Sequence, residues 1–306
     1  MANTYDIIII GGGAAGFTAG LYAARDRYRA LLIERFAAGG QILNCEHIEN
    51  YPGFPDGVAG YALGPLLQQQ ATSLGLEMKL AEVQSVRLDN ETKILQTDDG
   101  ELRARALIIA TGSSFAKLNI PGEDEFLGRG VSHCASCDGA FFMDQPVAVI
   151  GGGDAALDEG IHLTQYAAQV TIIHRREGLR ACRLLQERAR STEKLGFRWN
   201  TRVQAIEGSG EVQHLQLEDS RTGERSQMNV AGVFIFIGLS PNTQFLNDLL
   251  PVNEQGQIVT DLWMRTSVPG IFAAGDVRTD SSRQLISAAG DGATAALAAI
   301  QYLRTR

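Results

Sequence analysis

The sequence predicts an α/β protein in which two nucleotide-binding domains follow the same plan and the second is inserted into the first. Twice, an apolar stretch runs into a glycine-rich turn, an alanine-rich stretch without proline, and a second apolar stretch. This order is typical of a strand–helix–strand unit with parallel strands. The segments are Tyr5–Ile10, Gly11–Gly16 and Ala30–Ile33 in the first copy, and Val147–Ile150, Gly151–Ala156 and Val170–Ile173 in the second.

The first domain continues through a predicted helix and a set of strands. Residues Gly60–Gly75 favour a helix, and two short β stretches follow at Val83–Leu88 and Lys93–Thr97. Asp99-Gly100 is typical of a tight turn between strands. Beyond that turn, Ala106–Ile109 has the unbroken apolar character of a buried strand.

The rest of the chain completes the inserted domain and then returns to the first. Ala231–Ile237 predicts a further buried strand, and the alanine-rich stretch from Gly290 to Tyr302 predicts a terminal helix. The first and last parts of the chain would together form one nucleotide-binding domain around the inserted one. We expect the three parts at residues 1–115, 116–241 and 242–306.

The composition limits the class of protein. The chain has 306 residues, of which 44% are hydrophobic, which is enough for two packed domains. A formal charge of −8 and the lack of a basic stripe argue against a nucleic-acid partner. No stretch reaches the roughly 18–20 apolar residues that cross a bilayer, and the start of the chain has no signal-peptide pattern. We therefore expect a cytosolic protein, in which a cysteine pair is more often catalytic or metal-binding than structural.

The first glycine turn has the spacing of a dinucleotide-binding site. Gly11, Gly13 and Gly16 form G-x-G-x-x-G between a predicted strand and a predicted helix. In such a turn the glycines let the backbone approach a pyrophosphate, which the amides at the start of the helix then bind. Glu34 stands 23 residues after Gly11, where an acid accepts hydrogen bonds from ribose hydroxyls and repels a 2′-phosphate. The first site therefore suits FAD or NAD.

The second glycine turn is followed by the opposite charge. Its motif, Gly151–Ala156, ends in alanine instead of glycine, and His174 stands 23 residues after Gly151. Arg175 and Arg176 come next, and two guanidinium groups favour a 2′-phosphate through charge-assisted contacts. The second site therefore suits NADP(H), with a solvated basic turn as the alternative.

Cys134 and Cys137 form a C-x-x-C motif just before the first strand of the inserted domain. A zinc site would need two further ligands at comparable spacing, whereas Cys45 and Cys182 are isolated, so no metal is predicted. A redox-active dithiol is the better interpretation, because the surroundings of such a pair can stabilise a thiolate. Asp138 follows directly and could move a proton as thiol and thiolate exchange roles, although an aspartate there also caps helices and turns.

Together these motifs resemble those of the low-molecular-weight thioredoxin reductases, and the resemblance covers nearly the whole chain. A C-x-x-C-D-G segment inside the NADPH domain is specific to that family, since glutathione-reductase-like relatives carry their pair in the FAD domain. The matching segments are Gly11–Gly16, Gly39–Gln41, Glu49–Phe54, Ala110–Gly112, Cys134–Gly139, Gly151–Ala156, His174–Arg176 with Arg180-Ala181, Gly275-Asp276, and Arg283-Gln284 with Ala288–Gly290.

The resemblance implies two Rossmann-like, three-layer ββα domains, with FAD in the first and NADPH in the second. Electrons would pass from NADPH through FAD to the cysteine pair and then to a thioredoxin-like protein, in a cytoplasmic homodimer. Cys137 would face the flavin, Cys134 would attack the partner disulfide, and Asp138 would be the acid. The residues implied for FAD are Gly11, Gly13, Ala14, Ala15, Gly16, Glu34, Arg35, Gly40, Gln41, Asn50, Val83, Ala110, Thr111, Gly112, Gly275, Asp276, Arg283, Gln284 and Ala288. Those implied for NADPH are Gly153, Asp154, Ala155, His174, Arg175, Arg176 and Arg180.

Two positions depart from the family pattern, and three other functions stay open. Cys45 replaces part of a threonine-rich stretch, and Gly160 lies inside a predicted helix, where glycine costs about 1 kcal/mol relative to alanine. One alternative is a dithiol oxidase, whose relatives tend to lose the basic pocket. Another is an NADPH-linked reductase of ferredoxin or quinone, whose close members lack the C-x-x-C. The last is a non-enzymatic flavin sensor, which would not need a second phosphate-binding turn.

Overall fold

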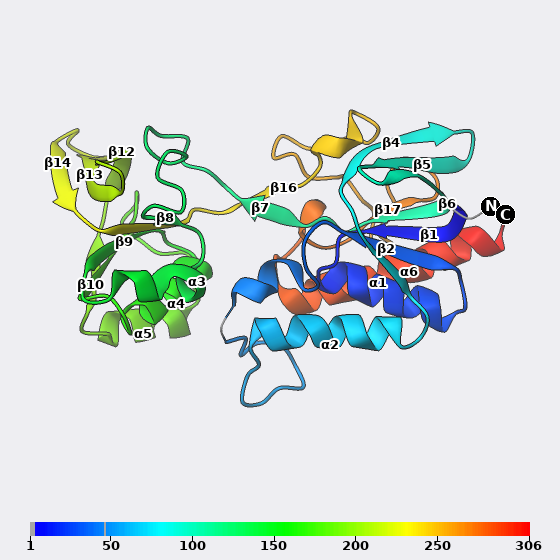
Figure 1. Ribbon diagram of the computed structural model, residues 1–306, viewed down its shortest axis with the longest axis horizontal. Coiled ribbons are helices and arrows are strands. Elements are labelled where there is room, and N and C mark those ends of the chain that lie inside the picture. Colours follow the sequence, from blue (N-terminus) through cyan, green and yellow to red (C-terminus); the bar gives the residue numbers. More distant parts are fainter. Residues whose placement is uncertain (1–3, 46) are drawn as a thin grey trace. The chain divides into compact units, whose positions relative to one another are not determined.

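A computed structural model of the chain describes residues 4–45 and 47–306. The described chain forms two compact units, one from the residues up to Ser114 together with Ser240–Arg306, the other from Phe115–Leu239 (Figure 1). The chain crosses between them in β7 (Ser113–Phe115) and β16 (Leu239–Pro241), which pair with each other. Each unit contains helices and a sheet with parallel strands, which confirms the predicted α/β class.

The first unit is built on a seven-stranded sheet with the order β3-β2-β1-β6-β5-β4, in which β17 also pairs with β6. Strands β1, β2, β3, β6 and β17 run parallel, while β4 and β5 form an antiparallel extension. Its elements are β1 (Thr4–Ile10), α1 (Ala14–Arg25), β2 (Ala30–Glu34), η1 (Gly40–Asn44), α2 (Gly60–Thr72), β3 (Glu77–Leu80), β4 (Val83–Asp89), β5 (Thr92–Thr97), β6 (Gly100–Ile109), η3 (Gln244–Leu246), β17 (Ile271–Ala273), η4 (Gly275–Val277) and α6 (Leu285–Arg304), where η denotes a 3₁₀ helix.

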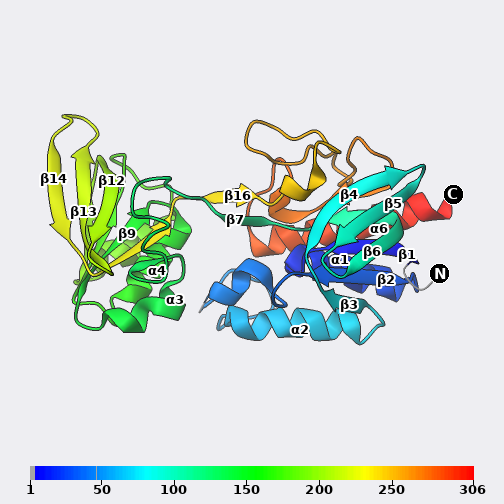
Figure 2. The same ribbon diagram turned by 45° about the horizontal axis from the view of Figure 1, so that its top comes forward.

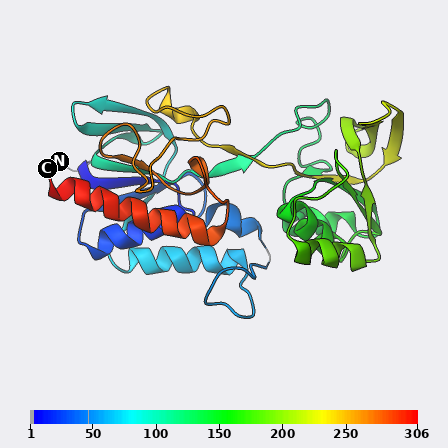
Figure 3. The ribbon, with the colours of Figure 1, turned by 180° about the vertical axis from the view of Figure 1, so that it is seen from behind.

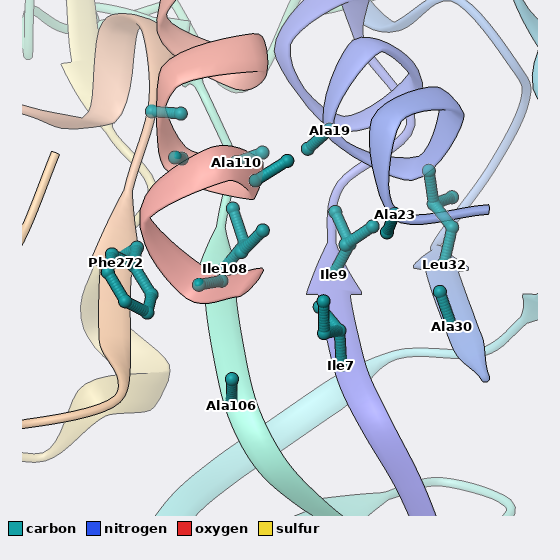
Figure 4. Close-up of a cluster of buried hydrophobic side chains, with 14 of the residues drawn as sticks. Ile7, Ile9, Ala19, Ala23, Ala30, Leu32, Ala106, Ile108, Ala110 and Phe272 are labelled. Atoms are coloured by element: carbon teal, nitrogen blue, oxygen red, sulfur yellow. The ribbon is translucent and has the colours of Figure 1, made fainter. Parts of the chain in front are cut away.

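Alternate residues of the central strands enter two separate cores. Ile7 and Ile9 of β1 pack with helix residues such as Ala19 of α1, while Ile8 and Ile10 pack on the opposite face of the sheet. Figure 4 shows the helix-side cluster, in which side chains of β1, β2 and β6 meet those of α1. This alternation follows from the two-residue period of a strand, and it explains why every residue of β1 from Ile7 onward is apolar.

Helices α1, α2 and α6 cover one face of this sheet (Figure 3, with α2 in cyan and α6 in red). Helix α6 approaches α1 so closely that a Cβ at Gly292 would lie 2.1 Å from the carbonyl oxygen of Ala15. Any larger residue at this position would push the two helices apart. The close approach brings the start of α6 beside the first glycine turn.

The second unit repeats the plan with a five-stranded parallel sheet in the order β11-β10-β9-β15-β8. A three-stranded antiparallel sheet, β12-β13-β14, is also present (Figure 2). Its elements are β8 (Val131–Ser132), α3 (Ala135–Asp138), η2 (Gly139–Phe142), β9 (Pro146–Gly151), α4 (Asp154–Leu163), β10 (Gln169–Ile173), α5 (Arg183–Ser191), β11 (Leu195–Arg198), β12 (Thr201–Gly208), β13 (Val212–Asp219), β14 (Arg225–Asn229) and β15 (Gly232–Phe236).

The parallel sheet of the second unit lies between its helices and its antiparallel sheet. Val147 and Val149 of β9 pack with residues of α4 and α5, whereas Ala148 and Ile150 pack with residues of β12 and β13. Helix α4 approaches the sheet closely, because a Cβ at Gly160 would lie 2.7 Å from Cδ1 of Ile172. Close helix–sheet packing therefore accounts for the glycine inside α4.

Some predicted bounds were wrong, and some elements were not predicted. Helix α2 ends at Thr72 and not at Gly75, whose positive φ of 106° takes it out of the helix. Helix α6 begins at Leu285, five residues before the predicted start at Gly290. Helix α5 and the antiparallel sheet were not predicted; α5 has only nine residues, most of them polar, and β12, β13 and β14 also contain many polar residues.

Candidate active site

The first glycine turn joins β1 to α1 and has the geometry of a phosphate-binding loop. A Cβ at Gly11 would lie 2.3 Å from the carbonyl oxygen of Ala110, and a Cβ at Gly16 would lie 1.8 Å from that of Gly11. Gly13 is the N-cap residue of α1 and has no side-chain cap, and a Cβ there would meet nothing within 4 Å. The turn is thus tightly packed at Gly11 and Gly16 and open at Gly13, which leaves the first amides of α1 available to an anion.

Glu34 lies at the end of β2 and is fixed against this turn. Its Oε2 accepts a hydrogen bond from the N–H of Gly12 over 2.6 Å, and its Oε1 accepts one from the N–H of Phe36 over 2.9 Å. Two backbone donors hold the carboxylate in one orientation beside the open turn. Arg35, by contrast, pairs with Glu82 at 3.4 Å on the surface.

The predicted FAD residues from distant parts of the sequence lie around the carboxyl ends of the parallel strands. A Cβ at Gly40 would lie 3.4 Å from Cα of Gly13, and one at Gly275 would lie 3.2 Å from Cβ of Ala15 and 3.6 Å from Cβ of Ala288. These contacts bring four segments to one edge of the sheet. In α/β sheets this edge is where ligands bind.

Side-chain hydrogen bonds tie further members of this set together. Gln41 donates from Nε2 to the carbonyl oxygen of Ser113 over 2.8 Å. Asn50 donates from Nδ2 to Oε1 of Gln284 over 3.2 Å, although the two residues are 234 positions apart. Thr111 donates to the carbonyl oxygen of Asn242 over 2.8 Å. Val83, at the start of β4, packs with the core on the other face of the sheet.

Asp276 lies in η4 and is partly buried. Its Oδ1 accepts a hydrogen bond from the hydroxyl of Ser281 over 3.0 Å. Burial raises the pKa of the Asp276 carboxyl above its ordinary value, and the charge of Asp291 adds to this, against the Ser281 hydrogen bond and the nearby Arg283. Arg283 itself has a positive φ of 55° and donates its N–H to Oγ of Ser281 over 3.1 Å. Ser281 and Asp291 were not among the predicted site residues, because the chain order does not reveal their contacts with this turn.

The second glycine turn joins β9 to α4 and repeats the geometry of the first. Gly153 is the N-cap residue of α4 and makes no side-chain cap. A Cβ at Gly153 would meet nothing within 4 Å. Asp154 Oδ1 accepts the N–H of Cys182 over 2.7 Å, and Arg180 donates its N–H to the carbonyl oxygen of Gly152 over 2.7 Å. The segment around Arg180 is therefore fastened to the turn.

His174 occupies the place that Glu34 has in the first unit, but it is buried. A Cβ at Gly152 would lie 2.5 Å from its ring, and its Nε2 has no hydrogen-bond partner among the described residues. Burial lowers the pKa of His174, with backbone hydrogen bonds opposing and Arg175 and Arg180 assisting the shift, so the neutral form is favoured near pH 7. The side chains of Arg175, Arg176 and Arg180 are exposed near this turn.

Cys134 and Cys137 form a disulfide at the start of α3. Cys134 is the N-cap residue, and its Sγ accepts a hydrogen bond from the N–H of Cys137 over 3.2 Å. Its own N–H donates to Oγ of Ser132 over 3.0 Å. Cys137 is exposed, and Asp138 is half-buried beside it. The arrangement offers an accessible disulfide with a backbone donor aimed at one sulfur.

Two features bear on ligands and on membranes. Within residues 4–45 and 47–306, no group of three or more His, Cys, Asp or Glu side chains is arranged to hold a metal ion. No helix in the same described ranges is both long and apolar enough to cross a membrane.

Comparison with known proteins identifies the family. Residues 5–293 match the model of the pyridine nucleotide-disulphide oxidoreductase family. A thioredoxin reductase of Bacillus subtilis is 45% identical over 300 residues, which cover 98% of this chain and 95% of that protein. The crystal structure of Lactococcus lactis thioredoxin reductase in the FR conformation superposes with a TM-score of 0.97 at 43% identity, covering 99% of this chain and 100% of that one. That of the T. acidophilum enzyme gives 0.93 at 34% identity, covering 99% of each chain. The chain therefore belongs to the pyridine nucleotide-disulphide oxidoreductase family and, within it, to the thioredoxin reductases.

Proposed function

We propose that this enzyme passes electrons from NADPH through FAD to the Cys134–Cys137 disulfide, and from the resulting dithiol to the disulfide of a thioredoxin. The observation that carries the proposal is the accessible disulfide at the start of α3, in a unit that also holds an open glycine turn with three exposed arginines. The names of the relatives support thioredoxin as the acceptor. We also propose a cytoplasmic homodimer, in line with the family.

The first unit has the groups that FAD requires. Gly13 leaves the amides at the start of α1 open for the pyrophosphate, and the fixed carboxylate of Glu34 would accept hydrogen bonds from the ribose hydroxyls. Gln41, Asn50 and Asp276, with the other residues gathered at the same sheet edge, would hold the remainder of the cofactor. FAD would supply the ability to accept a hydride and to return electrons to a disulfide.

The second unit has the groups that NADPH requires, with one change from the predicted set. Gly153 leaves the amides of α4 open for the pyrophosphate. The exposed guanidinium groups of Arg175, Arg176 and Arg180 would bind the 2′-phosphate. Because His174 is buried and favours its neutral form, we propose that it supports the Gly152 turn and leaves the phosphate to the arginines.

The cysteine pair would then act by thiol–disulfide exchange. The thiolate of Cys134, which faces the N–H of Cys137, would attack one sulfur of the partner disulfide and release the other as a thiolate. Cys137 would next attack Cys134, re-forming the internal disulfide and releasing the second partner sulfur. Two electrons pass to the partner. Asp138, the residue after Cys137 in the chain, would supply a proton to a departing thiolate.

An apolar surface close to the pair supports a protein acceptor. Phe141 is 76% exposed and Met143 is 53% exposed, and both follow Cys137 within six residues. Exposed aromatic and methionine side chains are enriched in protein interfaces. A small-molecule disulfide would not need such a surface.

The proposal is tested by NADPH-dependent reduction of the host's thioredoxins with the FAD-loaded enzyme. We expect turnover with the wild-type enzyme and its loss in the Cys134→Ser variant, in which NADPH still bleaches the flavin. Flavin reduction without reduction of any thioredoxin would refute the acceptor. Retained turnover of a ferredoxin or quinone in Cys134→Ser would favour that alternative, and fast reoxidation by oxygen with slow reduction by NADPH would favour a dithiol oxidase.

A further inference from the structure

Glu159 of α4 makes a direct contact with the helix that carries the cysteine pair. Its Oε2 accepts a hydrogen bond from the N–H of Ala135 over 2.8 Å. Ala135 is the first residue of α3, and its nitrogen belongs to the peptide bond that follows Cys134. Ala135 is fully buried and Glu159 is half-buried, so the contact lies at the packed boundary between α3 and α4.

Two amides in the first turn of α3 therefore have different acceptors. The N–H of Cys137 faces Sγ of Cys134, where it stabilises negative charge on the sulfur. The N–H of Ala135 is taken by a carboxylate, which brings a negative charge to the peptide next to Cys134. A neutral acceptor would satisfy the same amide without adding charge, so the carboxylate has an electrostatic effect beyond the hydrogen bond.

We propose that Glu159 is a positioning residue of the dithiol that fixes the first turn of α3 and makes the reduced pair a stronger reductant. Two electrons and two protons convert the Cys134–Cys137 disulfide into two thiols, and the Cys134 thiol then releases its proton to solvent. A carboxylate beside this turn disfavours the resulting thiolate. Reduced enzyme is thereby less stable relative to the disulfide, so electrons leave the pair more readily.

Other ionisable groups occur on and beside these two helices, and His162 lies one turn after Glu159 in α4. Asp138 lies within α3, His133 precedes the pair with its Nδ1 on the carbonyl oxygen of Ile235, and Asp158 lies beside Glu159 on the exposed face of α4. The Glu159→Gln variant keeps an acceptor for Ala135 and removes the charge. Asp158→Asn removes the same charge from the same helix, and Glu159→Asp retains the charge.

The test measures the dithiol equilibrium without a pyridine nucleotide or thioredoxin. FAD-loaded enzyme is equilibrated in glutathione redox buffers at about pH 7 and about pH 9, on either side of the ordinary thiol range. It is then quenched with an alkylating agent, and the fraction of dithiol is counted by mass spectrometry. The inference rests on the proposed exchange at Cys134, but this readout is independent of the acceptor, so failure of one does not imply failure of the other.

For Glu159→Gln we expect a roughly three- to tenfold shift toward dithiol at the higher pH, equivalent to about 15–30 mV, and a smaller shift at the lower pH. Alkylation of Cys134 in the reduced variant should begin at lower pH than in the wild type. Glu159→Asp and Asp158→Asn should stay within about twofold of the wild type. No shift, a shift of the same size at both pH values, or an equal shift in Asp158→Asn would overturn the proposal.

Discussion

Arg278 and Asp291 form a bidentate ion pair, which links α6 to the turn that contains Asp276. Nε of Arg278 lies 2.7 Å from Oδ2 of Asp291, and Nη2 lies 2.9 Å from Oδ1. The same Oδ2 accepts the N–H of Gly275 over 3.0 Å. The two side chains are only 14% and 10% exposed. Asp291 thus holds the residue that precedes Asp276, although it was not among the predicted site residues.

Replacing Asp291 by Asn should destabilise the protein strongly. The change leaves the guanidinium of Arg278 buried without a counter-charge, which costs about 3–5 kcal/mol in the free energy of unfolding. It should also lower the FAD content of the purified enzyme, because the turn before Asp276 loses an anchor. Urea unfolding and the flavin-to-protein absorbance ratio measure the two effects. Asp26→Asn, which breaks the exposed pair with Arg304, is the matched control and should cost about 0–1 kcal/mol.

The arginines after β10 should set the preference for NADPH over NADH. We expect the double variant Arg175→Ala, Arg176→Ala to raise KM for NADPH by roughly 100-fold or more, since hydrogen bonds to charged groups contribute about 1.5–3 kcal/mol each. The KM for NADH should change little, because NADH has no 2′-phosphate. Steady-state kinetics with both nucleotides provide the measurement. Arg221→Ala, which removes another exposed arginine of the same unit, should affect neither value, and an equal rise with both nucleotides would exclude 2′-phosphate recognition by these residues.

The repeated strand–turn–helix pattern predicted the parallel sheets, because apolar runs and glycine spacing are local properties of the sequence. The same pattern placed Glu34 and His174 at equivalent points after the two turns. It did not reveal that one is fixed by two amides while the other is buried under Gly152. That difference depends on packing between segments that are far apart in the chain.

The partners of the predicted site residues were harder to foresee for the same reason. Glu159 contacts Ala135 from another helix, and Asp291 contacts Gly275 from another element. Neither residue belongs to a spaced motif, so only the fold reveals its contact. Gly160 is an intermediate case. The sequence showed a glycine inside a predicted helix, but it did not show the contact with Ile172 that explains this glycine.

Gly160→Ala should destabilise the protein, although alanine is the better helix former. The new Cβ would lie 2.7 Å from Cδ1 of Ile172, the end of a fully buried side chain that would have to shift within the packed core. Overpacking of this kind costs about 1–3 kcal/mol, which equals or exceeds the gain of about 1 kcal/mol from helix propensity. Gly290→Ala in α6 is the matched control, because a Cβ there meets nothing within 4 Å. Urea unfolding of the two variants should show changes of opposite sign, and stabilisation by both would show that α4 can move away from the sheet without cost.

Asp276→Asn should separate a binding role from a structural one. Because the pKa of Asp276 is raised in the fold, its ionised form is less favourable there than in the unfolded chain. The stability that this carboxyl contributes is present below its unfolded pKa, about 3.9, and is lost as the pH rises through its folded pKa. Asparagine does not titrate and can still accept the Ser281 hydrogen bond.

The FAD-free Asp276→Asn protein should therefore be more stable than the wild type at pH near 7, and the difference should shrink as the pH falls toward about 4. The same variant should retain less FAD if, as proposed, this carboxylate contacts the cofactor. Urea unfolding across this pH range, together with flavin content, measures both effects. Asp280→Asn, at an exposed neighbouring position, should change neither. A stability difference that is constant with pH would show that burial of the Asp276 charge is not its source. A gain in stability together with a loss of FAD would mean that this buried carboxylate destabilises the fold and is needed to bind the cofactor.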